Sequence, residues 1–164
     1  MNIHPIFVHF PIALFSVYAV CECLRFGRLR RSAGWRTVKI ALLGFGVVGA
    51  VAALITGDMA GDMMGRSALI EAHGAWAAAS VWIFGLLCAA YAVPDLARYF
   101  RFRWAENAFM RMVRRFEGSL LTVIAALVGL VAITVAGALG GAIVYGPDID
   151  PVVHFIYGLV MGGA

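Results

Sequence analysis

Charged side chains are scarce in this chain. Asp, Glu, Lys and Arg make up 13% of its 164 residues, while hydrophobic residues make up 63%. Soluble domains have about a quarter of their residues charged and just under half apolar. A soluble core of this size cannot bury so much apolar surface. The composition therefore excludes a water-soluble globular protein and predicts one that contacts a lipid bilayer.

Cysteine is also rare, and the common enzyme motifs are missing. Cys21 and Cys23 are two positions apart, so they point to different faces of a helix, and Cys88 is the only other cysteine. We expect no disulfide. The sequence has no nucleophile–base pair, phosphate-binding loop or HExxH motif. This leaves no sign of a hydrolase or transferase, and we expect at most a redox component of the membrane.

Basic residues are confined almost entirely to two clusters. Each cluster separates a pair of apolar segments, which is the pattern of cytoplasmic loops in membrane proteins rather than of a nucleic-acid-binding surface. The first cluster consists of Arg25, Arg28, Arg30, Arg31, Arg36 and Lys39. The second consists of Arg98, Arg101, Arg103, Arg111, Arg114 and Arg115. The charge distribution therefore predicts that the N-terminus and the C-terminus both lie on the periplasmic side.

Four apolar segments are long enough to cross a bilayer, which needs about 20 helical residues. They predict an all-α, four-helix transmembrane bundle that forms one domain over residues 1–164, without internal repeats. The tail over residues 146–164 is too short to cross, and we expect an interfacial segment. The predicted spans are residues 5–24, 38–56, 72–93 and 120–144.

The four histidines all fall on the predicted periplasmic side. His9 and His73 start different spans at a similar depth, and two imidazoles on facing helices can ligate the iron of haem b from opposite sides. His4 is five positions from His9, about 140° around a helix, so both face one site only if Pro11 distorts the helix. Otherwise we expect His4 to belong to a second cofactor site, together with His154. The leading hypothesis is a haem-b-binding electron-transfer module whose partner is a quinone or a periplasmic redox protein.

Two other interpretations remain open. The histidines can be polar tips at the membrane interface of a non-catalytic structural subunit, in a homo-oligomer or a larger membrane complex. The segment TGDMAGDMMGRS also repeats methionine every four residues, and thioethers bind Cu(I). Under that third hypothesis, Met59 and Met63 are copper ligands.

Several motifs resemble a family of small bacterial membrane proteins known as domain of unknown function 2231. They are HPIFVHFPIAL, the Thr-Gly pair that ends the second span, the histidine that opens the third span, and GGAIVY. The resemblance implies a four-helix membrane domain, sometimes found beside cytochrome-type domains, and we expect it to lie in the bacterial inner membrane. The chain departs from the family after GGAIVY, so His154 is not supported by it. The positions that carry over are His4, Pro5, His9, Pro11, Gly57, His73, Gly140, Gly141 and Tyr145.

Overall fold

The computed structural model describes residues 4–27, 32–103, 107–117 and 119–162, and these residues contain helices and no strand. The predicted all-α class is confirmed. The helices are α1 (His4–Cys23), α3 (Ala33–Met64), α4 (Ala68–Tyr99), α5 (Ala108–Phe116), α6 (Leu120–Tyr145) and α7 (Pro151–Met161).

The four long helices, α1, α3, α4 and α6, are each long and apolar enough to cross a membrane, which confirms the predicted number of spans. Helix α3 continues past the predicted end at Thr56 because the residues that follow include no proline. It ends at Met64, and the residue that follows, Gly65, has a φ of 82°, which favours glycine. Ser67 then caps α4, since its hydroxyl accepts a hydrogen bond from the Ile70 amide at 3.3 Å.

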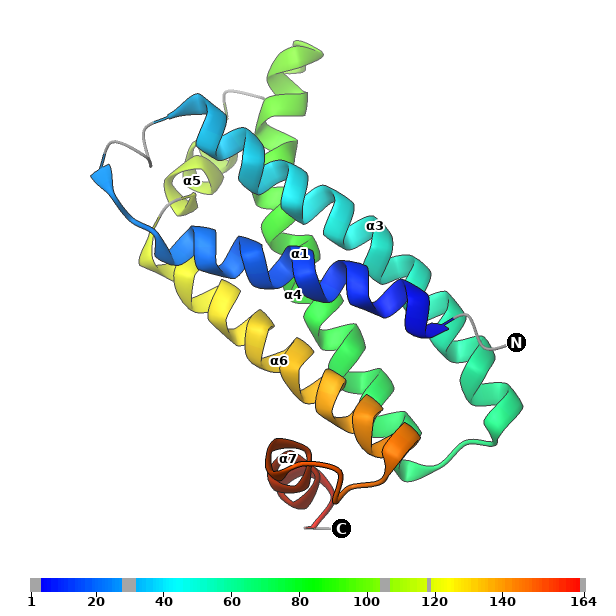
Figure 1. The fold of residues 1–164 in the computed structure, drawn as a ribbon. Coiled ribbons are helices and arrows are strands. Elements are labelled where there is room, and N and C mark those ends of the chain that lie inside the picture. Colours follow the sequence, from blue (N-terminus) through cyan, green and yellow to red (C-terminus); the bar gives the residue numbers. More distant parts are fainter. Residues whose placement is uncertain (1–3, 28–31, 104–106, 118, 163–164) are drawn as a thin grey trace.

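The long helices form an antiparallel bundle made of two hairpins, α1–α3 and α4–α6 (Figure 1). Helices α1 and α4 begin at one end of the bundle, which we call the histidine end because it holds His4 and His73. The opposite end, which we call the arginine end, holds Arg36 and the short helix α5. Helix α7 folds back against α6, where Val153 packs beside Gly141.

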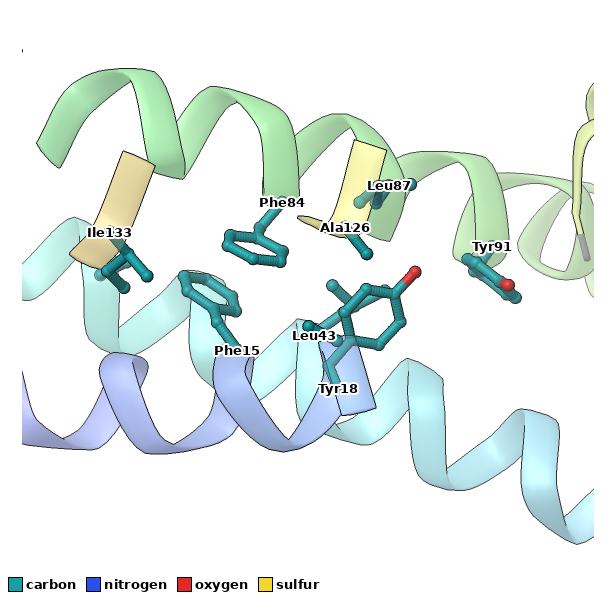
Figure 2. Close-up of a cluster of buried hydrophobic side chains, with 10 residues drawn as sticks. Phe15, Tyr18, Leu43, Phe84, Leu87, Tyr91, Ala126 and Ile133 are labelled. Carbon is teal, nitrogen blue, oxygen red and sulfur yellow. The ribbon is translucent and has the colours of Figure 1, made fainter. Parts of the chain in front are cut away.

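Aromatic rings fill the centre of the bundle. Phe15 of α1 and Phe84 of α4 stack with their centroids 4.1 Å apart and their planes 12° apart (Figure 2). Helix backbones approach these rings through glycines, since a Cβ at Gly129 would lie 2.8 Å from the Phe84 ring. Small residues that allow close approach are the usual means by which membrane helices pack.

Towards the arginine end, the core contains a buried ion pair. Lys39 of α3 donates to Glu22 of α1 at 3.0 Å, and both side chains are almost fully buried. Tyr91 and Thr122 also donate to the Glu22 carboxylate, each at 3.0 Å. All four helices therefore meet at one carboxylate in the interior of the bundle.

The orientation in the membrane remains a prediction that cysteine labelling can check. In a variant without the native cysteines, Cys introduced at Ser32 or Asn107 should react only with a reagent that enters the cytoplasm. Cys at Ser67 should react with an impermeant reagent from the periplasm, because the arginine-rich loops stay inside. Labelling of Ser32→Cys by the impermeant reagent, with Ser67→Cys protected, would reverse the orientation.

Candidate functional site

A cavity of about 810 Å³ lies at the histidine end and is lined by all four long helices. This volume is within the range of about 300–1,000 Å³ that is typical of small-molecule and cofactor sites. The walls are mostly alanine, glycine and branched apolar residues. His4, His73 and Ser80 are the polar side chains of the interior, and the Ser80 hydroxyl donates to the Ala77 carbonyl of its own helix at 2.8 Å, whereas Asp58, Arg66 and Glu71 line the rim.

His4 is held against helix α3. Its Nδ1 lies 3.2 Å from the hydroxyl oxygen of Thr56, which itself donates to the Ala52 carbonyl at 2.9 Å. Because the hydroxyl has one proton, its oxygen is left to accept the Nδ1–H of His4. The ring also lies against Gly57, where a Cβ would be 2.9 Å from the His4 Cε1 atom.

His73 is held against helix α6 in the same way. Its Nδ1 donates to the Ala136 carbonyl at 2.8 Å, and a Cβ at Gly140 would lie 3.2 Å from its Cε1 atom. A carbonyl oxygen only accepts, so the proton of neutral His73 is on Nδ1. In both histidines, the Nε2 atom therefore carries the lone pair that a metal requires.

The two imidazoles form a pair across the cavity. Their centroids are 6.2 Å apart and their planes are 87° apart. A direct hydrogen bond of about 2.9 Å between the rings would place the centroids only about 5.1 Å apart. With metal–nitrogen bonds of about 2 Å, two imidazoles on opposite sides of one metal have centroids about 6.3 Å apart. The observed spacing is too long for a direct hydrogen bond and fits an edge-to-face ring contact, and it is close to the spacing that two imidazoles would have on one metal.

The structure thus brings His4, and not His9, to His73. His9 lies on the exposed side of α1, where its Nδ1 bonds to the Pro5 carbonyl at 2.6 Å. The two positions differ by about 140° around the helix, and α1 continues through Pro11 without bringing both rings inward. The expected depth of His9 in the membrane suggested that it faces His73. The rotation of α1 about its own axis instead places His4 towards the cavity.

The other predicted ligands lie elsewhere. His154 is exposed on α7, and its Nδ1 atom bonds to Asp148 at 2.8 Å. His154 is not among the residues that line the cavity with His4, so the two do not share a site. Met59 and Met63 are 61% and 72% exposed, and neither is among the residues that line the cavity. Within the described part of the chain, no group of three or more His, Cys, Asp or Glu side chains could hold a metal ion.

Sequence reasoning missed the residues that support the histidines. The Ala136 carbonyl leaves no mark in a sequence, because every residue has a carbonyl group. Thr56 was visible only as part of the Thr-Gly motif that ends the second predicted span. At the rim, Arg66 bonds to Asp62 at 3.0 Å and to Asp58 at 3.3 Å, and its hydrogen bond to Asp62 raises the pKa of the guanidinium.

These features define a multi-pass membrane protein with a histidine-lined cavity between its spans. The protein family described as "Predicted membrane protein (DUF2231)" matches residues 1–152. The chain belongs to this family, as the motifs in its sequence indicated. The comparisons with curated proteins and with solved structures found no match.

Proposed function

We propose that the protein binds haem b between His4 and His73 and acts as an electron-transfer module in the membrane. The observation that carries the proposal is the His4–His73 pair, with centroids 6.2 Å apart in a cavity of about 810 Å³. Two histidines are sufficient for haem iron because the porphyrin supplies its other four ligands. When bound, haem b supplies a one-electron redox change at its iron.

The protein's contribution is to orient and insulate the site. Hydrogen bonds from Nδ1 to Thr56 and to the Ala136 carbonyl fix the tautomer and the rotation of each imidazole, and they increase the basicity of Nε2. Gly57 and Gly140 leave room for the rings. The apolar walls would surround a bound cofactor mainly with hydrocarbon.

The proposal includes a location and a partner class. The arginine clusters support an inner-membrane orientation with both termini and the cavity on the periplasmic side. A haem near that surface is within reach of a quinone in the outer half of the bilayer or of a periplasmic redox protein.

The test is a visible spectrum of protein purified from cells supplied with haem. We expect a sharp low-spin α-band after reduction. His4→Ala and His73→Ala would each remove one of the two side chains proposed to hold the iron, so each variant should become high-spin or lose most of its haem. His9→Ala is the matched control, since His9 is on the same helix but outside the cavity, and it should keep the wild-type spectrum.

Two other outcomes identify the alternatives. Protein that contains no haem and no metal would favour a structural subunit in which the imidazoles pack edge to face. Copper found by metal analysis, and lost in Met59→Leu or Met63→Leu, would instead favour the copper hypothesis.

A further inference from the structure

We infer that the chain consists of two equivalent helical hairpins, related by a pseudo-two-fold axis along the bundle, and that the cavity's ligand lies on this axis. The hairpins are α1–α3 and α4–α6. The equivalence rests on the positions of lining and core residues, whereas the identity of the ligand rests on the proposed function. The sequence analysis expected no internal repeat, and the equivalence inferred here concerns the arrangement of the helices and not similarity of sequence.

The first correspondence is between α1 and α4. Every cavity-lining residue of α1 has a counterpart in α4 at a constant offset of 69 positions, as between His4 and His73. Core residues follow the same offset, because Phe15 corresponds to Phe84. The five lining pairs are His4 with His73, Pro5 with Gly74, Val8 with Ala77, Pro11 with Ser80, and Ile12 with Val81.

The second correspondence is between α3 and α6, at a constant offset of 83 positions. It relates Gly57, beside His4, to Gly140, beside His73. It also relates Gly46, beside Phe15, to Gly129, beside Phe84. The six lining pairs are Ala50 with Ile133, Ala53 with Ala136, Leu54 with Gly137, Gly57 with Gly140, Ala60 with Ile143, and Gly61 with Val144.

Contacts between equivalent residues place the axis. In a two-fold arrangement, a residue touches its own counterpart only on the axis. Three such contacts occur along the bundle: His4 with His73 at 6.2 Å between centroids, Phe15 with Phe84 at 4.1 Å, and Tyr91 donating to Glu22 at 3.0 Å. The last pair, 22 and 91, also obeys the offset of 69. The axis therefore runs from the histidine pair through the aromatic stack to the buried carboxylate.

The direction of the helices agrees with this axis. Helices α1 and α4 both run from the histidine end to the arginine end, and α3 and α6 both run back (Figure 1). Units with the same direction are related by an axis along the membrane normal, an arrangement known among membrane transporters. The larger offset for α3 and α6 reflects the longer connection between α4 and α6, which contains α5.

A ligand on such an axis meets the same chemistry on both of its faces. Each hairpin offers one imidazole, a hydrogen-bond acceptor for its Nδ1, and one glycine beside the ring. This arrangement would hold a metal-containing cofactor that takes one imidazole from each hairpin, and it does not fit a ligand that needs protein groups on one face only. The main departure is Leu54, whose counterpart Gly137 leaves open space where a side chain would project.

Exchanging this unequal pair tests the placement on the axis. Gly137→Leu alone fills part of the cavity, so we expect haem occupancy to fall at least tenfold. The double exchange, Leu54→Gly with Gly137→Leu, moves the same space to the equivalent side and should restore occupancy to within about threefold of wild type. Gly85→Leu is the control, because a Cβ there also meets nothing and Gly85 does not line the cavity. A double exchange as defective as Gly137→Leu would overturn the inference.

A second measurement does not depend on haem. Gly46→Ala and Gly129→Ala each push a methyl group towards an equivalent phenylalanine, so both should lower the unfolding temperature by a similar amount. Gly44→Ala, with open space around its Cβ, should not lower it. Unequal losses at 46 and 129 would contradict the repeat. A wild-type protein without haem would refute the proposed function and the ligand on the axis, while these glycine variants would still decide the repeat.

Discussion

Removing either member of the Glu22–Lys39 pair is expected to destabilise the bundle severely, whereas removing both charges should cost much less. Glu22→Gln leaves the Lys39 ammonium buried without a counter-ion, and Lys39→Met leaves the Glu22 carboxylate in the same state. Breaking a buried pair in this way costs about 3–5 kcal/mol of unfolding free energy. The double variant, Glu22→Gln with Lys39→Met, buries no charge and should recover most of that loss.

Equilibrium unfolding in detergent micelles measures these differences as a double-mutant cycle. Arg66→Gln is the control, because the bonds of Arg66 to Asp58 and Asp62 are solvent-exposed and such pairs contribute at most about 1 kcal/mol. Single and double variants of equal stability would mean that the buried pair does not hold the helices together.

Phe84→Ala is expected to produce the next largest loss of stability. Phe84 is fully buried, stacks on Phe15 and meets the backbone of Gly129, so its removal leaves a cavity at the centre of the bundle. Truncating a buried phenylalanine costs about 3–5 kcal/mol in soluble proteins. In a bilayer the unfolded reference is also apolar, so mainly the packing contribution is lost and we expect about 2–3 kcal/mol.

Phe45→Ala provides the matched control. Phe45 is 64% exposed on α3 and faces outward from the bundle, so its removal should change the unfolding free energy by less than about 0.5 kcal/mol. The same unfolding assay applies to both variants. A Phe84→Ala protein as stable as Phe45→Ala would show that the aromatic stack contributes little to the association of the two hairpins.

Prediction from sequence succeeded where the bilayer imposes a simple requirement. Apolar runs such as residues 120–144 had to be helical and about 20 residues long, because lipid offers no partner for backbone groups. It was less accurate where a helix continues beyond the apolar run. Helix α3 extends to Met64 and α4 to Tyr99, since neither the polar residues of one nor Pro94 of the other stops the helix.

The candidate site could be predicted only in part. His73 and His4 were both named, but His9 was placed opposite His73 because depth can be estimated from a sequence and helix rotation cannot. Rotation is set by which small residues face which rings, as Gly49 faces Phe10 and Gly57 faces His4. The repeat was hidden for a related reason. His4 and Phe15 are the only residues of α1 whose counterparts in α4, 69 positions later, are identical. The other pairs differ because apolar packing needs a suitable side-chain volume and not the same residue.

The sequence by itself determined the membrane class, the four spans and the separation of arginines from histidines, because solvation by lipid or water acts on each segment independently. Only the tertiary structure decided which histidines meet, which groups orient them, and that two dissimilar hairpins are equivalent. These depend on close packing between segments up to 100 residues apart, as where Thr122 and Lys39 both reach Glu22. Such packing is a property of the assembled bundle, and no single segment contains it.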